Sequence, residues 1–466
     1  MDSSLANTLA ARDLAVVWHP CTQMHDHETL PMVPIASAEG AWLYGHDGRR
    51  YLDAVSSWWT CLLGHRHPRI VAALKDQLDR LDHVMLAGFT HEPAIELAEA
   101  LVRIAPRGGS RSSPRLQGDA PTLTRVFYAD NGSSAIEVAL KLSFHYWRNA
   151  GRGERSRFIA LTGGYHGETL GALSVTDIAL YRKTYAPLLL EPIFAPSPDA
   201  YEALPGENAA DCARRRRGEL RAILERHAHE VSAIIVEPLV QCAGGMRMYD
   251  ASYLSGLRTL CDEFGVHLIA DEIAVGFGRT GTLFACEQAG IVPDFLCLSK
   301  GLTGGTLALS AVLTTSNVYD AFYADYSTGK AFLHSHSYTG NPIACRAALA
   351  TLGVLADEPI IERNRALAAH LASRISPLAD HAHVADVRQT GMIAAIELVR
   401  HKATRTPFPA EERRGLHVYR HGLERGVVLR PLGNVVYFMP PYCITPDEID
   451  VMVDVAAEGI ELAAAE

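Results

Sequence analysis

Residues 295–305 read FLCLSKGLTGG, and Lys300 within this stretch ends an apolar run and opens a glycine-rich turn. The chain contains only six lysines beside 37 arginines, and the other five stand among polar or amphipathic residues. An amine that follows Phe-Leu-Cys-Leu-Ser is partly desolvated, which lowers the pKa of lysine and favours the neutral nucleophile. The alternative is a lysine that extends from a strand end into solvent. The stretch alone leaves both interpretations open.

An acidic pair ends a second apolar run upstream. Residues 267–272 read HLIADE, and Asp271 lies 29 residues before Lys300. A buried carboxylate requires a cationic or protonated partner. Pyridoxal phosphate has a ring nitrogen that takes an aspartate partner and an aldehyde that takes a lysine. The two runs together therefore predict a pyridoxal-phosphate site.

Short apolar runs alternate with helical patterns from Arg125 onward, which predicts an α/β fold with a mostly parallel central sheet flanked by helices. Polar motifs directly follow five of the apolar runs. Ligands of such sheets bind outside the carboxyl ends of the strands, so the five motifs predict one shared site. The motifs are residues 130–133 (DNGS), 164–167 (GYHG), 237–238 (EP), 271–272 (DE) and 299–300 (SK).

The first of these motifs continues into a strong helical pattern. Ser134 and Glu137 have the spacing of a capping box, which predicts that a helix begins here. A helix N-terminus with glycine and serine is suited to phosphate, so Gly132 and Ser133 are candidate phosphate ligands, with a plain helix cap as the alternative. Cap and dipole hold an anion by only about 1–2 kcal/mol. A further donor is therefore expected, and Ser337 is the candidate.

Aromatic and arginine side chains supply candidates for binding the flat ring and the substrate. Tyr165 stands between glycines, where its ring is placed to stack on a cofactor, with core packing as the alternative. Trp58 and Trp59 are adjacent in a predicted strand, so one is expected in the core and the other facing solvent or a ligand. Arg430 suits a carboxylate and Tyr437 follows seven residues later, although a surface ion pair is the plain interpretation of this arginine.

Composition excludes several classes of protein. The 466 residues carry a net charge of −10 with pI near 6.1, which argues against nucleic acid or an anionic membrane as a partner. Nine scattered cysteines without a CxxC pair fit a reducing compartment, and no apolar stretch reaches 18 residues, so we expect a cytoplasmic protein. His65 and His67 lack an acidic or cysteine companion, so no metal site is predicted.

The chain is long enough for a large and a smaller domain. We expect an N-terminal segment (1–75) that contributes to the small domain, a large cofactor-binding domain (76–350) and a C-terminal small α+β domain (351–466). Residues 106–124 are rich in Gly, Ser and Pro, which predicts a surface loop within a domain.

One motif favours a different class of enzyme. Residues 276–281 (GFGRTG) match the dinucleotide fingerprint of nicotinamide oxidoreductases. The fingerprint should directly follow its strand and open a helix, whereas here DEIAV precedes the motif and TLFACE follows it. The oxidoreductase is therefore the weaker alternative.

The motifs DEIAVGFGRTG, SKGLTGG and GYHG resemble those of class III pyridoxal-phosphate aminotransferases of fold type I. The resemblance implies that Lys300 attaches the cofactor and moves a proton, and that Asp271 keeps the ring nitrogen protonated. It further implies that Tyr165 stacks on the ring. The resemblance implies that the phosphate is bound by Gly132, Ser133 and a partner subunit's Ser337. It implies that the substrate contacts Trp58, Tyr165, Lys300, Ser335, Arg430 and Tyr437. Arg279 and Glu237 resemble the family's charged pair near the cofactor.

A second set of motifs, among them WHPCTQM, SSWW and RPLGNVVYFMPPY, is similar to the branch of this family that aminates 8-amino-7-oxononanoate with S-adenosylmethionine for biotin synthesis. This resemblance implies a homodimer with active sites at the interface. Another class III ω-amino acid aminotransferase is the near alternative. Cys21 stands where many relatives have tyrosine, and HSHSYTGNP departs from the HGPTF-type segment, so the donor, S-adenosylmethionine or lysine, stays open.

Overall fold

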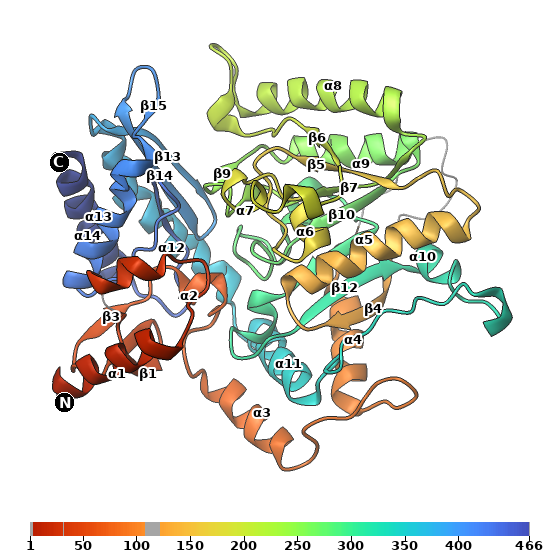
Figure 1. Ribbon diagram of the computed structural model, residues 1–466, viewed down its shortest axis with the longest axis horizontal. Coiled ribbons are helices and arrows are strands. Elements are labelled where there is room, and N and C mark those ends of the chain that lie inside the picture. Colours follow the sequence, from red (N-terminus) through yellow and green to blue (C-terminus); the bar gives the residue numbers. More distant parts are fainter. Residues whose placement is uncertain (1–2, 31, 108–121, 466) are drawn as a thin grey trace. The chain divides into compact units, whose positions relative to one another are not determined.

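The computed structural model describes residues 3–30, 32–107 and 122–465 (Figure 1). Most of the loop predicted at 106–124 therefore lies outside the described residues. The chain folds as two compact units. Unit 1 comprises residues 1–68, 366–388 and 392–466, and unit 2 comprises residues 69–365 and 389–391.

Unit 2 is built on a seven-stranded sheet in the order β4-β12-β11-β10-β7-β5-β6. All neighbours pair in parallel except β12, which runs antiparallel to both β11 and β4. Every residue of the central strands β7, β10 and β11 is buried, as expected for strands covered on both faces. The strands are β4 (Leu123–Ala129), β5 (Arg157–Leu161), β6 (Ile193–Ala195), β7 (Val231–Val236), β10 (His267–Asp271), β11 (Phe295–Leu298) and β12 (Ser310–Thr315).

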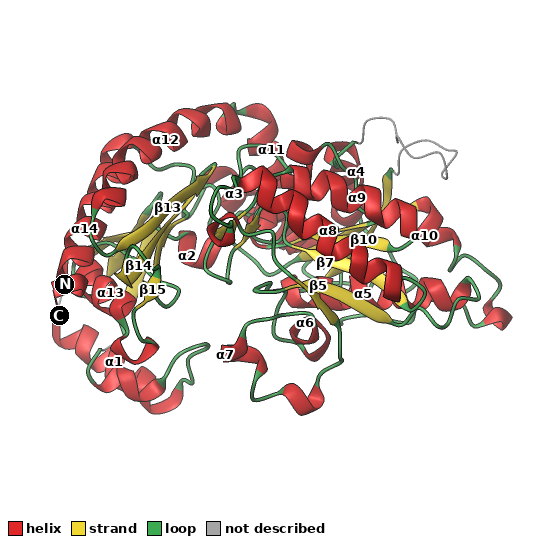
Figure 2. Cartoon of the chain, turned by 90° about the horizontal axis from the view of Figure 1, so that it is seen from above, coloured by secondary structure: helices red, strands yellow, loops and turns green. Residues whose placement is uncertain are grey.

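One long helix, α5 (Gly132–Asn149), packs across this sheet (Figure 2). Its buried side chains, among them Ile136 and Leu140, join alternate residues of the strands, such as Ile235 and Ile269, in one apolar cluster. Because successive strand residues face opposite sides of a sheet, the other set is left for α9 (Ser252–Phe264), which packs on β10, and for α8 (Ala209–His227), which packs on α9. The sheet is thereby held rigidly between helices.

The other α-helices of unit 2 are α3 (Pro68–Leu78), α4 (Glu92–Ile104), α6 (Leu170–Ser174), α7 (Ala179–Arg182), α10 (Ser316–Asp320) and α11 (Pro342–Asp357). The first residue of α3, Pro68, is the last residue of the first segment of unit 1. A two-stranded ribbon of β8 (Val240–Gln241) and β9 (Arg247–Met248) follows β7. The strand register places the ends of β10 and β11 together, since Asp271 pairs with Cys297. The start of β12 meets the end of β4, since Ser310 pairs with Ala129. The residues that follow β4, β10 and β11 therefore share one edge of the sheet with the residues that precede β12.

Unit 1 contains two antiparallel sheets. The first consists of β1 (Ile35–Glu39), β2 (Trp42–Gly45) and β3 (Arg50–Leu52), and a tight turn at Asp47-Gly48 joins β2 to β3. The second consists of β13 (Val384–Thr390), β14 (Ile393–His401), β15 (Thr406–Pro407) and β16 (Val435–Phe438). The helices are α1 (Ser3–Val16), the short turn α2 (Ser56–Trp59), α13 (Arg414–Glu424) and α14 (Pro446–Ala465), while α12 (Ile360–Ile375) begins in unit 2 and ends in unit 1. Nowhere in the described residues is a helix both long and apolar enough to span a membrane.

Candidate active site

Lys300 follows β11 directly and begins a short 3-10 helix, Lys300–Thr303. Its φ of 45° lies in the left-handed region, a strained conformation for a non-glycine residue that is common at functional sites. Ser299 fixes the turn, because its Oγ donates to the carbonyl of Leu309 at 2.7 Å. Burial lowers the pKa of the Lys300 amine, while the charges of Asp271, Cys242 and Glu237 oppose that shift. The sheet edge thus holds an amine that is easily deprotonated.

Asp271 ends β10 and is buried. Its Oδ2 lies 2.8 Å from His166 Nδ1, and its Oδ1 accepts from the backbone N–H of Ile273. His166 is itself buried and donates its backbone N–H to Thr176 Oγ1 at 2.9 Å. A carboxylate held in this way by a histidine is oriented for a cationic ligand.

Glu237 follows β7 and is also buried. Its two carboxylate oxygens accept the backbone N–H groups of Tyr165 and Cys242, each at 2.9 Å. Burial raises its pKa to about 7; the nearby Asp271 charge adds to this rise and His166 opposes it. Glu237 thereby joins the GYHG motif to the end of β7.

Tyr165 is half-buried, so its ring is not part of the core. Its hydroxyl donates to Glu168 Oε1 at 2.9 Å, and its ring lies 5.7 Å from that of Tyr181. The ring is therefore not packed in the core, which was the alternative to a role in stacking. The ring lies at the edge of the core, as stacking on a cofactor would require.

The start of α5 differs from the predicted capping box. Asn131 is the N-cap, because its side chain accepts from the backbone N–H of Ser134 at 3.1 Å. Glu137 instead accepts from the N–H of Gly171 at 2.7 Å. The helix consequently begins at Gly132, three residues earlier than a capping box of Ser134 and Glu137 would place it.

The first turn of α5 packs closely against the GYHG motif. Ser133 Oγ accepts from the backbone N–H of Glu168 at 3.0 Å. A Cβ at Gly167, where φ is 127°, would lie 1.9 Å from Ser133 Oγ, and a Cβ at Gly132 would lie 3.0 Å from Ile273 Cγ2. Gly167 is therefore required by close approach and a side chain at Gly132 would crowd Ile273, so the helix N-terminus lies beside the end of the GYHG motif and beside Ile273, two residues after Asp271.

Trp58 and Trp59 lie in unit 1 and not in a strand, so the predicted strand there is wrong. Residues 56–59 all have positive φ and form a turn. Trp59 is buried and its Nε1 donates to the Tyr437 hydroxyl at 3.0 Å. Trp58 is 38% exposed, and the guanidinium of Arg430 lies over its ring at 4.6 Å. The expected division into one core and one exposed tryptophan holds, and Arg430 packs on an aromatic face.

Ser335 and Ser337 are exposed and lie between β12 and α11. The polar contacts of the neighbouring histidines run to α5 and to the end of β4: His334 Nδ1 lies 2.9 Å from Lys141 Nζ, and His336 Nδ1 lies 3.5 Å from Asp130 Oδ2. These two serines are presented on the surface of unit 2.

The structure therefore brings together Lys300, Asp271, Tyr165, Gly132 and Ser133 in unit 2, and Trp58, Arg430 and Tyr437 in unit 1. Sequence analysis missed the role of His166 as the partner of Asp271. Its signal was present in the GYHG motif, where a histidine follows a strand at the same sheet edge.

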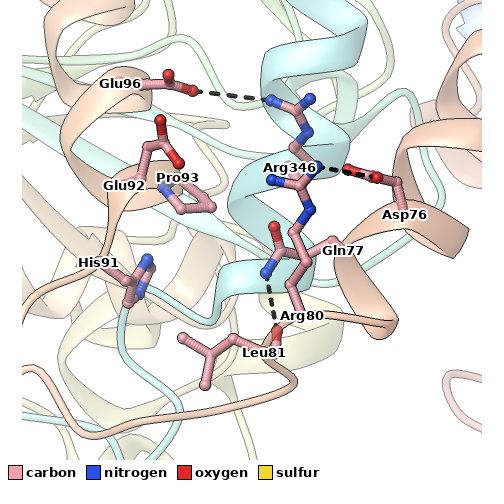
Figure 3. Close-up of a pocket in the computed structure, with 9 residues that line it drawn as sticks. All are labelled: Asp76, Gln77, Arg80, Leu81, His91, Glu92, Pro93, Glu96 and Arg346. Carbon is pink, nitrogen blue, oxygen red and sulfur yellow. Dashed lines mark hydrogen bonds and ion pairs between the residues drawn. The ribbon is translucent and has the colours of Figure 1, made fainter.

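A pocket of about 340 Å³ lies elsewhere in unit 2 (Figure 3). Its charged side chains pair with one another, Arg346 with Glu96 at 3.7 Å and Arg80 with Asp76 at 3.2 Å. None of the strand-end residues lines it. The lining residues are Asp76, Gln77, Arg80, Leu81, His91, Glu92, Pro93, Glu96 and Arg346.

Comparison with known proteins identifies relatives over nearly the whole chain. The chain is 46% identical over 447 residues to the adenosylmethionine-8-amino-7-oxononanoate aminotransferase of Nitratidesulfovibrio vulgaris, covering 96% of this chain and 80% of that protein. It is 46% identical over 448 residues to the enzyme of the same name from Geobacter sulfurreducens, covering 96% of each.

Solved structures agree with this relationship. The crystal structure of adenosylmethionine-8-amino-7-oxononanoate aminotransferase from Methanocaldococcus jannaschii has a TM-score of 0.90 and 37% identity, covering 98% of this chain and 99% of that one. The omega transaminase from Pseudomonas jessenii in complex with PMP also has a TM-score of 0.90, at 28% identity and covering 98% of each chain.

These neighbours confirm the predicted fold class, the fold type I arrangement of a mostly parallel sheet with a smaller α+β part. Residues 276–281, which supported the oxidoreductase alternative, lie in consecutive turns and open no helix. A family model described as Aminotransferase class-III matches residues 23–459. The chain belongs to the class III aminotransferase family, as the motifs around Lys300 predicted.

Proposed function

We propose that this aminotransferase uses pyridoxal 5'-phosphate to move the amino group of S-adenosylmethionine to 8-amino-7-oxononanoate, giving 7,8-diaminononanoate. The chemistry is carried by one observation: the amine of Lys300, with its pKa lowered by burial, lies in the field of Asp271 at the sheet edge. The choice of substrates is supported by relatives 44–46% identical over 95–96% of this chain that bear the corresponding name.

The residues at the sheet edge fit this cofactor. Asp271 is the acid that would meet the ring nitrogen. Its Oδ2 lies 2.8 Å from His166 Nδ1, which holds the carboxylate in place. The phosphate would be held by the N-terminus of α5, where Gly132 carries no side chain that would obstruct it and Ser133 offers a hydroxyl. When bound, the cofactor supplies an aldehyde that takes an amine and a ring that accepts electrons.

The chain's own residues perform the remaining tasks. Lys300 Nζ takes and returns the proton at the reacting carbon, for which a lowered amine pKa is favourable. Asp271 keeps a proton on the ring nitrogen, because its carboxylate stabilises the cation. Tyr165 is held by its backbone N–H on Glu237 and its hydroxyl on Glu168, and its ring would stack on the cofactor and exclude water from one face.

We assign substrate contacts to Trp58 and Arg430 in unit 1. The guanidinium of Arg430 is held over the indole at 4.6 Å, which leaves its donors free to take a carboxylate. Tyr437 is buried and accepts from Trp59 Nε1, so it anchors the turn that carries Trp58. The assignment of Arg279 and Glu237 as a charged pair near the cofactor also stays a proposal.

We further propose a cytoplasmic homodimer with active sites at the interface, in which the partner subunit's Ser337 assists the phosphate and Ser335 the substrate. The exposure of both serines is consistent with this assignment. The predicted domains, 1–75 with 351–466 and 76–350, likewise stay predictions as folding units.

A visible spectrum followed by a donor screen tests the proposed function. The purified protein is expected to be yellow, to lose that absorbance when S-adenosylmethionine is added, and to recover it with 8-amino-7-oxononanoate. Strong activity with simple ω-amino acids and none with S-adenosylmethionine would favour the other branch of the family. Bleaching by S-adenosylmethionine with no recovery on adding 8-amino-7-oxononanoate would contradict the proposed acceptor.

A further inference from the structure

Residues 56–59 form one turn of left-handed helix, although none of them is glycine. Their φ values are 50°, 45°, 70° and 73° in order. Two backbone hydrogen bonds close the turn, from Trp59 N to the carbonyl of Val55 and from Thr60 N to that of Ser56, both at 2.9 Å. L-residues adopt this conformation at a cost of about 1–2 kcal/mol each, so the surrounding structure must hold the turn in place.

The carboxylate of Asp53 holds the beginning of the turn. Ser57 donates its backbone N–H to Oδ1 at 2.9 Å and its hydroxyl to Oδ2 at 2.7 Å. His65 Nε2 lies 2.9 Å from the same Oδ2. Asp53 is fully buried, which by itself raises its pKa, yet the hydrogen bonds from His65 and Ser57 bring that pKa below its usual value. The carboxylate is thus kept charged and bound to the turn.

Two further contacts fix the other side of the turn. Ser56 Oγ donates to the carbonyl of Met439 at 2.7 Å, and Trp59 Nε1 donates to the Tyr437 hydroxyl. Trp59 is thereby anchored in the core of unit 1, and the reversed handedness directs Trp58 to the exposed side, where Arg430 covers its ring. A relaxed, right-handed turn would point the Trp58 Cβ elsewhere.

We propose that Asp53 and His65 are positioning residues for substrate binding: their pair keeps the turn left-handed and so fixes Trp58 and Arg430 in the orientation that meets the substrate. This inference rests on the assignment of Trp58 and Arg430 to substrate binding under the proposed function. Neither Asp53 nor His65 touches the substrate. They act through the backbone of Ser57 and Trp58.

Variants at His65 test the Asp53–His65 pair, because they leave in place the Asp53 carboxylate that binds Ser57. His65→Leu removes the hydrogen bond to Asp53, whereas His65→Gln offers a side-chain N–H in place of Nε2. His370→Leu is the matched control, because it breaks another Asp–His pair of unit 1, His370 Nε2 to Asp450 Oδ1 at 2.8 Å, on helices α12 and α14. Ser57→Ala, which removes only the hydroxyl bond, serves if His65→Leu does not fold.

The holoenzyme of each variant is assayed with both substrates. His65→Leu is expected to lower kcat/KM by about tenfold to a hundredfold, chiefly by raising KM, because substrate-contacting groups are displaced while the cofactor residues of unit 2 are untouched. His65→Gln is expected to restore part of the loss, and His370→Leu to leave kcat/KM unchanged. A fall in kcat alone, or an equal loss in His370→Leu, overturns the positioning role.

Acrylamide quenching of Trp58 gives a second readout that does not depend on activity. Its contribution is obtained as the difference between each variant and the same variant carrying Trp58→Phe. Quenching is expected to rise in His65→Leu and not in His370→Leu, and an unchanged value overturns the inference. A wild-type protein that transfers no amino group between the two substrates refutes the proposed function, and in that case the quenching still decides whether the pair holds the turn.

Discussion

Lys300 combines two unfavourable states at one residue, a left-handed backbone and a desolvated amine. Strain of this kind persists where the surrounding structure determines it, here through the Ser299 hydrogen bond and the glycines that follow. An ordinary structural lysine needs neither feature. The combination explains why a single lysine marks the reacting position.

Lys300→Ala is expected to fold normally and to lose turnover by at least about 10²–10⁴-fold, because the positioned acid–base group is removed. Steady-state assays and a melting curve check this. Lys75→Ala, on the exposed side of α3, is the control and should keep both activity and melting temperature. Multiple turnover by the Lys300 variant at the wild-type rate would assign the chemistry to another residue.

Asp271→Asn tests the carboxylate that faces the ring nitrogen. An amide does not stabilise the protonated ring, so the half-reaction with the amino donor should slow on the order of a hundredfold, while the melting temperature changes little. Stopped-flow absorbance measures the half-reaction. Asp294→Asn is the matched control, because this partly buried aspartate accepts a hydrogen bond from Arg258 at 2.8 Å at the opposite end of β11. It should lower stability and spare the half-reaction. The reverse pattern would contradict the assignment.

At the scale of elements, α5 joins the sheet to the proposed phosphate site. Asn131→Ala removes its N-cap and should lower the free energy of unfolding by about 1 kcal/mol and the cofactor affinity by about fivefold. Equilibrium dialysis measures the affinity. Asn208→Ala removes the corresponding cap of α8 and is expected to lower stability alone. Equal cofactor affinities in the Asn131→Ala and Asn208→Ala variants would show that the N-terminus of α5 does not bind the phosphate.

The strand β10 carries a pH-sensitive group within the core. Burial lowers the pKa of His267 to about 4, so the unfolded chain binds a proton that the folded chain does not as pH falls below about 6.5. At about 1.4 kcal/mol per pH unit, about 3 kcal/mol of stability is lost between pH 6.5 and 4. His267→Gln should lose less over this range in denaturant titrations. Parallel losses in both proteins would show that other groups dominate.

Most elements follow from local patterns in the sequence, and the exceptions have physical causes. Apolar runs predicted β4, β5, β7, β10, β11 and β12, and the runs are nearly continuous in β7, β10 and β11 because these strands are buried on both faces. The antiparallel direction of β12 was not predictable, since it depends on pairing with β4 and β11. The turn at 56–59 was missed because its handedness is set by Asp53 and His65, which lie outside it.

At the scale of the molecule, unit 2 exposes apolar side chains on two segments that pack together. Phe89 and Met85 precede α4, Leu333 and Tyr338 precede α11, and the His83 and Tyr338 rings lie 5.0 Å apart. Exposed large apolar side chains grouped on neighbouring segments are typical of a subunit interface. It is the surface on which the proposed homodimer is expected to form.

Phe89→Glu should therefore weaken the dimer about tenfold or more, because a charge would replace an exposed aromatic ring that the proposed interface buries. Sedimentation velocity over a range of concentrations measures the dissociation constant. Leu462→Glu, on the exposed face of α14, is the control and should leave it unchanged. A Phe89→Glu protein that sediments like the wild type would place the interface elsewhere.

The candidate site was predictable only in part, because some of its contacts join residues that are far apart in the sequence. Lys300, Asp271 and Tyr165 follow apolar runs, so their shared sheet edge could be inferred from order along the chain. The Asp271–His166 and Tyr165–Glu237 contacts join residues 105 and 72 positions apart, and no local pattern encodes them. The role of Ser335 came from family resemblance alone, while Ser337 and Arg430 were proposed from the chemistry of their side chains, and all three roles stay predictions.

The scarcity of lysine has a practical consequence. Arginine resists acylation under conditions that modify amines, and four of the other five lysines, Lys75, Lys141, Lys183 and Lys402, are exposed. An acylating reagent therefore meets few competing side chains in this protein. Shielding of one amine by the cofactor becomes readable as a single missing mass increment in an intact spectrum, without an engineered label.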